Sequence, residues 1–144
     1  MYSAIKTLHS SVAWLALALI LVAVITAIIS VSGKKTLSSA NFKVTFFAFV
    51  VSHIQLLLGL ILYFVSPHGF HNLSGATMKD PAARLLALEH PLINIIAIGL
   101  ITIGYIKAKK ALAIGNAGNT VLIYYTIALV LLLSRIPWNL WLNL

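Results

Sequence analysis

Residues 7–33 of the chain read TLHSSVAWLALALILVAVITAIISVSG and contain no Asp, Glu, Lys or Arg. A helix needs about 20 mostly apolar residues to cross the hydrocarbon core of a bilayer. This stretch is long enough to do so, and it lies between Lys6 on one side and Lys34 on the other. It therefore predicts a membrane-spanning helix over residues 8–32.

Three later stretches predict further membrane-spanning helices. One of them stops before Pro67, which has no backbone N–H to continue a helix. The next starts where Asp80 can cap the first turn and Pro81 can take the first helical position. The last follows the turn-forming sequence GNAGN at residues 115–119. The predicted spans cover residues 43–66, 81–109 and 120–141.

The composition of the whole chain agrees with these four spans. Of its 144 residues, 61% are hydrophobic and 8% are charged, and the mean hydropathy is +1.04. A soluble domain carries about 25% charged residues, so this chain cannot cover a surface that faces water. Because backbone polar groups in lipid must be satisfied internally and no strand-like alternation occurs, the spans are predicted to be helices. We therefore predict a single domain over residues 1–144, an all-α integral membrane four-helix bundle with up-down-up-down topology.

Positive charge is concentrated in the short connections between the predicted spans. The net charge is +8, and six lysines flank two of these connections. They are Lys34, Lys35, Lys43, Lys107, Lys109 and Lys110. Since lysine-rich loops stay in the cytoplasm, both termini and the longer loop at residues 67–80 are predicted to lie on the outer, periplasmic side of a bacterial inner membrane. The charge forms no stripe on a soluble face, so the expected partner is the lipid bilayer and not a nucleic acid.

Few polar side chains lie inside the predicted spans, and each is a candidate for function because placing it in lipid is costly. From a rise of about 1.5 Å per residue, four of them lie near one level at the outer surface, and His53 lies deeper. The four are His9, Glu89, His90 and Arg135. His9 and His90 each head a helix face rich in small residues, and Pro91 predicts a kink that re-aims His90.

Isolated histidines on separate apolar helices suit the ligation of haem iron. A b-type haem requires no covalent motif, whereas a c-type haem is excluded because the chain has no cysteine. We predict His9 and His90 as the first pair of ligands, His53 as the alternative partner, and Arg135 as a partner for the propionates. The predicted function is electron transfer by haem b, with a quinone or another redox subunit as a partner.

Simpler interpretations of the same residues stay open. His9 fits an ordinary polar residue at the membrane interface, His53 fits a hydrogen bond between two helices, and Glu89 with Arg135 fits an ion pair. The protein is then a cofactor-free accessory membrane subunit that packs against a partner. Assembly of several copies of the chain into a homo-oligomer is a further open interpretation. A third interpretation is a site for a divalent metal or copper, built from His9, His90 and Glu89.

Several short motifs are spread along nearly the whole chain. They are Leu8-His9-Ser10 before Trp14, SHIQLLLGL at residues 52–60, Met78-Lys79-Asp80, Glu89-His90-Pro91 and Ser134-Arg135-Ile136-Pro137-Trp138. With these motifs the chain resembles a group of small bacterial four-helix membrane proteins labelled cytochrome b, and more broadly the four-helix b-type cytochrome domains. The resemblance implies haem b binding and electron transfer in a respiratory or redox system, with His9, His53 and His90 as candidate ligands. A two-haem cytochrome usually supplies four ligands, so three histidines imply one haem and a spare histidine, or none.

Overall fold

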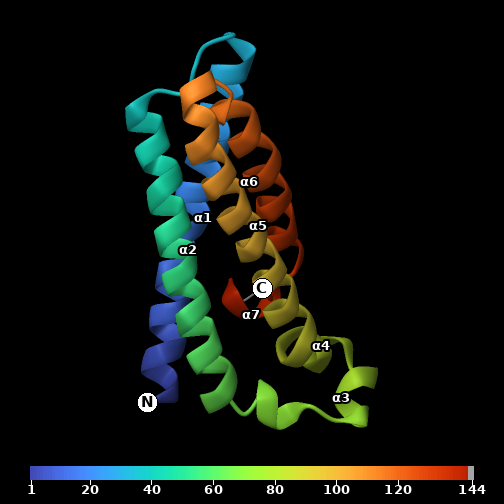
Figure 1. The fold of residues 1–144 in the computed structure, drawn as a ribbon. Helices are drawn as coiled ribbons and strands as arrows, with labels where there is room; N and C mark the ends of the chain where they lie inside the picture. Colours follow the sequence, from blue (N-terminus) through green and yellow to red (C-terminus); the bar gives the residue numbers. More distant parts are fainter. Residues whose placement is uncertain (143–144) are drawn as a thin grey trace.

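A computed structural model describes residues 1–142 of the chain, and all regular structure within them is helical. Four helices are long and apolar enough to cross a membrane, and they run up, down, up and down along the chain (Figure 1). The predicted all-α four-helix bundle is therefore confirmed. In order, the elements are α1 (Tyr2–Ser32), α2 (Ser39–Val65), the 3-10 turn η1 (Phe70–Asn72), α3 (Gly75–Lys79), α4 (Pro81–Arg84), the π-helical turn η2 (Leu85–Glu89), α5 (His90–Ala111), the 3-10 turn η3 (Leu112–Ile114), α6 (Ala117–Ser134) and α7 (Trp138–Trp141).

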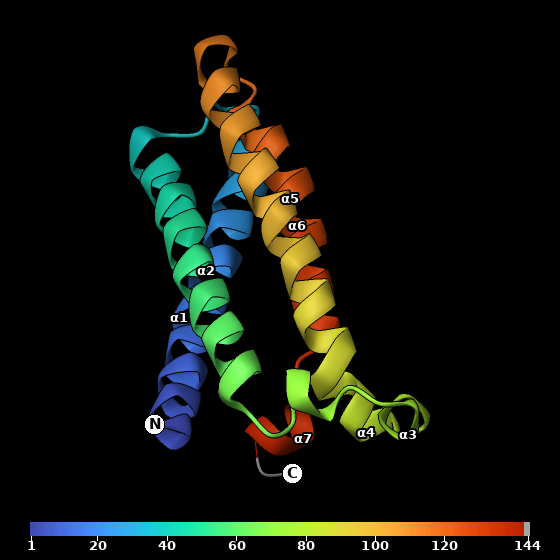
Figure 2. The same cartoon turned by 60° about the horizontal axis from the view of Figure 1, so that its bottom comes forward.

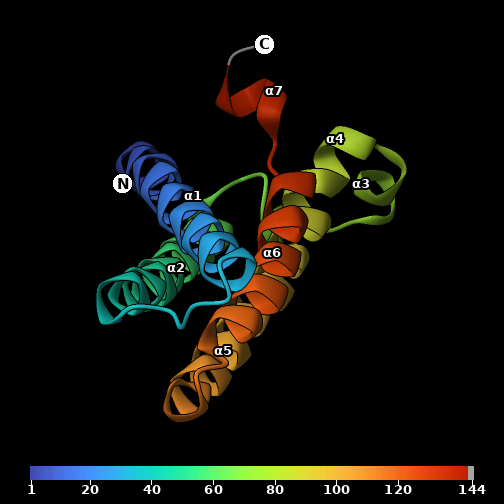
Figure 3. The same cartoon turned by 90° about the horizontal axis from the view of Figure 1, so that it is seen from above.

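The helices form two pairs, α1 with α2 and α5 with α6, and the pairs meet where α1 packs against α6 and α2 against α5. The short connections at residues 33–38 and 112–116 lie at one end of the bundle, which we call the lysine end (Figure 2). The N-terminus, the connection at residues 66–80 and α7 lie at the opposite end, which we call the histidine end. The two pairs stand side by side when viewed along the bundle (Figure 3), and they diverge toward the histidine end (Figures 1 and 2).

The interior of the bundle is packed with small side chains, which let the helices approach closely. The buried alanines include Ala16, Ala23 and Ala27 of α1, Ala48 of α2, Ala97 and Ala108 of α5, and Ala117 and Ala128 of α6. The two small-residue faces predicted below His9 and His90 thus serve as packing faces. Large apolar side chains point outward instead, and at most 33% of the residues in any membrane-spanning window are buried. An apolar outer surface of this kind is what lipid requires.

Local signals set the helix starts. The Ser38 hydroxyl accepts a hydrogen bond from the backbone N–H of Asn41 at 3.1 Å, so α2 begins four residues before the predicted span. Asp80 caps the third spanning helix as predicted, because its carboxylate accepts from the backbone N–H of Ala82 at 3.0 Å. From Pro81 that helix continues through η2 and α5 to Ile114.

The predicted end of the fourth span at residue 141 is wrong, since α6 stops at Ser134. Pro137 has no N–H and disfavours a helical conformation in the residue before it. Trp138 compensates by donating its indole N–H to the backbone carbonyl of Leu133 at 3.1 Å, which satisfies an acceptor that the ending helix leaves free. Arg135 therefore lies just past the end of α6.

Pro91 is accommodated by the wider π-helical turn η2 directly before it. There the backbone N–H of His90 bonds to the carbonyl of Leu85, one residue further back than in an α-helix. Because Pro91 has no N–H, the carbonyl of Ala87 lacks the donor that a helix would supply from that position. The hydroxyl of Tyr63 on α2 donates to this carbonyl at 3.0 Å instead. The predicted effect of Pro91 thus takes the form of a wider turn that α2 holds in place.

Replacing Tyr63 by phenylalanine is expected to lower the free energy of unfolding by about 1–2 kcal/mol, because the buried Ala87 carbonyl loses its partner. Unfolding of the protein in detergent micelles measures the loss. The matched control is Tyr105→Phe, since Tyr105 stacks on Phe49 at 4.6 Å between ring centroids and its hydroxyl makes no hydrogen bond within residues 1–142. Tyr105→Phe should have the same free energy of unfolding as the wild type. An equal decrease in both variants would contradict a stabilising hydrogen bond from Tyr63 to the Ala87 carbonyl.

Candidate functional site

Two of the three predicted histidines meet at the histidine end. His9 of α1 and His90 of α5 have their ring centroids 6.3 Å apart, and their ring planes lie at 81° to each other. Because α1 and α5 belong to different helix pairs, the two rings lie on the boundary between the pairs. The predicted proximity of these side chains is confirmed, whereas their role as ligands stays a prediction.

His90 is held by the chain segment that follows α6. Its Nδ1 lies 2.7 Å from the backbone carbonyl oxygen of Arg135, and the amide of Asn94 donates to the backbone carbonyl of His90 at 2.6 Å. A carbonyl only accepts, so Nδ1 of His90 carries the proton and Nε2 of the neutral ring keeps its lone pair. Histidines that bind metals commonly donate their second ring N–H to a carbonyl in this way.

His9 is held by two residues of α2 that the sequence analysis did not single out, Gln55 and Gly59. The amide nitrogen of Gln55 lies 3.1 Å from Nδ1 of His9 and 3.0 Å from its backbone carbonyl oxygen. Gly59 leaves room for the ring, because a Cβ at this position would lie 3.1 Å from Cε1 of His9. The available signal was an amide side chain in an otherwise apolar run, one helical turn before a glycine.

His53 lies apart from the other two histidines, on the seam between α2 and α5. Its Nδ1 is 2.8 Å from the carbonyl oxygen of Phe49, and its Nε2 is 3.1 Å from the hydroxyl of Thr102. Both ring nitrogens are therefore engaged by hydrogen bonds. This geometry is that of a polar residue joining two helices, which was one of the open interpretations of His53.

Glu89 lies between two arginines at the same end of the bundle. Its carboxylate is 2.7 Å from Nε of Arg84 and 3.3 Å from Nε of Arg135. The predicted contact between Glu89 and Arg135 is thus present, and Arg84 is a nearer partner that the sequence analysis missed. Two guanidinium groups on one carboxylate leave a surplus positive charge beside the two histidines.

Removing Glu89 is expected to destabilise the protein through both arginines. In a double-mutant cycle, Glu89→Gln and Arg84→Gln should be less than additive in the temperature of unfolding, since either change breaks the same contact. The coupling between Glu89 and Arg135 should be weaker than that between Glu89 and Arg84, because the ion pair with Arg135 is longer, at 3.3 Å. The measurement is made in detergent at low ionic strength, where charges are least screened. Lys79→Gln serves as the control, and full additivity of both pairs would show that the cluster is not coupled.

The arrangement does not favour a site for a bare metal ion. Both carboxylate oxygens of Glu89 face arginines. Within residues 1–142 no group of three or more His, Asp or Glu side chains is placed to hold a metal. The site therefore offers two facing imidazoles and nearby cationic groups.

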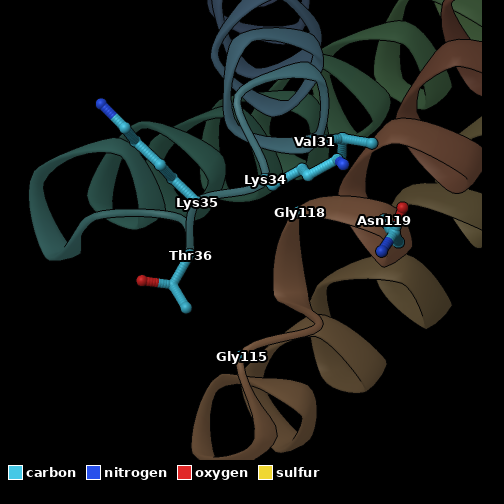
Figure 4. A pocket seen from close by; sticks show the side chains of 7 residues that line it. All are labelled: Val31, Lys34, Lys35, Thr36, Gly115, Gly118 and Asn119. Atoms are coloured by element: carbon cyan, nitrogen blue, oxygen red, sulfur yellow. The ribbon is translucent and has the colours of Figure 1, made fainter.

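Two cavities lie away from the facing histidines. An apolar groove of about 320 Å³ between α1 and α6 is lined by Trp14, Leu17, Ala18, Leu21, Leu129, Leu133 and Trp138. Trp14 stacks on Trp141 of α7 at 4.3 Å between ring centroids, so the indoles gather at one end of this groove. The second cavity, about 290 Å³, lies at the lysine end, where the side chain of Lys34 reaches toward α6 and that of Lys35 points away (Figure 4).

Comparison of the chain with models of protein families, with curated proteins and with solved structures found no match.

Proposed function

We propose that the protein is a membrane b-type cytochrome-like electron carrier, in which the imidazoles of His9 and His90 would hold one haem b. The observation that carries the proposal is the meeting of these two rings at 6.3 Å on the boundary between the helix pairs. Haem b supplies reversible one-electron transfer at its iron, and the protein supplies ligation, orientation and polarity.

The spacing of the two rings suits a shared iron. A metal binds an imidazole nitrogen at about 2 Å, so two imidazoles that would hold one iron have to lie close together. The observed centroid distance is 6.3 Å.

The surroundings of the rings add two further supports. The bond from His90 to the carbonyl of Arg135 leaves Nε2 with a lone pair for a ligand. The surplus positive charge of Arg84 and Arg135 over Glu89 suits the two propionates of a haem at the membrane surface. Arg135 keeps its expected role in this proposal, and Arg84 joins it. His53, which the hydrogen bond to Thr102 engages, is the spare histidine.

The proposal also includes the membrane in which the protein lies and its orientation there. We place the histidine end on the periplasmic side of a bacterial inner membrane, because the lysines at the other end favour the cytoplasm. A cysteine introduced at Lys109 of this cysteine-free chain should be labelled by an impermeant thiol reagent only after the inner face is made accessible. A cysteine introduced at Lys79 should be labelled in intact spheroplasts. The reverse pattern would overturn the orientation.

The absorption spectrum of the purified protein tests the function. We expect a Soret band that shifts on reduction with dithionite, and a haem content near one per chain. A colourless protein that binds copper or zinc would favour the metal-site alternative. A colourless protein that binds neither would favour the accessory subunit, whose partner would then be sought among co-purifying membrane proteins. A quinone or redox subunit as partner, and a homo-oligomer, stay predictions.

A further inference from the structure

The chain segment that follows α6 touches both helix pairs at the histidine end. The backbone carbonyl oxygen of Arg135 lies 2.7 Å from Nδ1 of His90 on α5. Further along the segment, the indole of Trp141 stacks on that of Trp14 on α1, with ring centroids 4.3 Å apart and ring planes at 24°. Residues 135–141, which we call the strap, therefore connect α5 of one pair with α1 of the other.

The strap lies where the two helix pairs diverge. Figures 1 and 2 show α7, which forms its second half, between the diverging ends of the pairs. On the α2 side of this boundary, the hydroxyl of Tyr63 joins α2 to the carbonyl of Ala87 at 3.0 Å. On the other side, no side-chain hydrogen bond or ion pair within residues 1–142 joins α1 directly to α5 or α6. At this end, the strap is thus the counterpart of Tyr63 on the α1 side.

Local hydrogen bonds fix the course of the strap. The indole N–H of Trp138 donates to the carbonyl of Leu133 at 3.1 Å, which ties the start of α7 to the last turn of α6. The backbone N–H of Trp141 donates to the carbonyl of Pro137 at 3.0 Å and closes the single turn of α7. Trp141 is therefore held at a set position relative to the end of α6, and its stack on Trp14 holds α1 at that position.

The stack of the two indoles has more order than a membrane surface alone would impose. Tryptophans gather at both membrane surfaces because their amphipathic rings favour the interface. That tendency accounts for several indoles at one end of the bundle, but it does not require two of them to lie face to face. Trp14 and Trp141 share their ring faces as offset stacked aromatic pairs do.

We propose that the strap holds the two helix pairs together at the histidine end and thereby sets the distance between His9 and His90. The contact on which this depends is the stack of Trp141 on Trp14. One end of the strap contacts the His90 ring itself, and the other end contacts the helix that carries His9. Without the stack, α1 can move away from α5, and the facing rings separate. The spacing of the pairs belongs to the protein without a cofactor, whereas its effect on a bound haem rests on the proposed function.

The first test measures the separation of the pairs in the cofactor-free protein. Because the chain has no cysteine, two introduced cysteines can carry spin labels. Ala4→Cys on α1 and Ala82→Cys on α4 place the labels at exposed positions on the two pairs. Double electron–electron resonance measures the distance between the labels. We expect Trp141→Ala to give a longer mean distance and a broader distribution than the labelled protein that keeps Trp141. An unchanged distribution would overturn the inference.

Three further variants show whether the stack is responsible. Leu140→Ala removes a side chain of the same turn that is 63% exposed, and Trp141→Phe keeps a ring that can stack. Both should keep the original distance, and an equal lengthening in Leu140→Ala would count against the stack. Trp14→Ala should lengthen the distance as Trp141→Ala does, and the double variant should show no further change, since either substitution removes the stack. Additive changes would show that the indoles act as independent interface anchors, which would overturn the role of the stack.

The second test uses the haem-loaded protein and measures how fast haem leaves it. If the facing rings can separate, haem should be lost faster from Trp141→Ala than from the wild type, whereas Leu140→Ala should match the wild type. Transfer of haem to an excess of apomyoglobin measures the rate. Equal rates in Trp141→Ala and the wild type would overturn the claim that the strap sets the distance between the histidines.

The two tests separate failure of the inference from failure of the proposed function. If haem is bound and the label distance in Trp141→Ala is unchanged, the function stands and the inference falls. If the wild type binds no haem, the proposed function falls, and the distance measurement alone decides whether the strap holds the pairs together.

Discussion

Under the proposed haem function, loss of haem is the expected result of replacing either His90 or His9 by alanine. Losing a supporting hydrogen-bond partner of a metal ligand typically costs about 10–100-fold in metal affinity, so losing the ligand itself should cost at least about 100-fold. Haem content and the reduced-minus-oxidised spectrum of the purified variants measure this loss. Both variants should keep their helical circular dichroism, since the small-residue packing faces below the two rings are untouched.

His53→Ala is the matched control for this prediction. It removes a histidine of similar exposure from the same bundle, together with the hydrogen bond to Thr102, but it lies on the α2–α5 seam and away from the facing rings. Its haem content should equal that of the wild type. Free imidazole added to His90→Ala should restore part of the Soret band, because it can occupy the vacated position. Loss of haem in His53→Ala with retention in the other two would show that the wrong pair was chosen.

The sequence contains the spans and the shared depth of the polar residues, but not their rotation about the helix axes. Lengths of apolar runs and a fixed rise per residue are enough to place His9, Glu89, His90 and Arg135 at one level. The contact of His9 with Gln55 depends on which face of α2 meets α1, and that is decided by packing around Gly59. For this reason the depth of the site in the membrane could be predicted from the sequence, whereas the contacts of His9 with Gln55 and Gly59 on α2 could not.

The ion pair between Arg84 and Glu89 could not be predicted from the sequence because it depends on a local irregularity of the helix. In an α-helix, residues five apart point to different sides, so the spacing of Arg84 and Glu89 predicts no contact. The π-helical turn bonds each residue to the fifth one before it, and this brings the two side chains to 2.7 Å. Pro91 predicted a kink in this helix, but a proline alone does not specify a π-helical turn. The end of α6 was misplaced for a related reason, because apolar residues continue beyond Pro137 in α7.

Introducing a methyl group at Gly104 is expected to destabilise the protein by about 1–3 kcal/mol, the usual effect of overpacking a close contact. A Cβ at Gly104 would lie 2.5 Å from Cβ and 3.1 Å from Cγ of Tyr124, and 3.5 Å from the ring of Tyr125. The Cβ of Tyr124 is fixed to its own backbone, so the contact is relieved only if α5 and α6 move apart. Tyr125 resists that movement, since it is fully buried and its hydroxyl donates to the backbone carbonyl of Thr45 on α2 at 2.9 Å.

Gly99→Ala is the control for Gly104→Ala, because both glycines lie on α5 and no atom lies within 4 Å of a Cβ at Gly99. With no collision, alanine should stabilise the helix by about 0.5–1 kcal/mol through its lower backbone entropy. The two substitutions are chemically identical, so their opposite signs isolate the contact between α5 and α6. Unfolding free energies in detergent micelles compare them. Equal effects of the two substitutions would mean that α5 and α6 do not pack as closely as the Tyr124 contact requires.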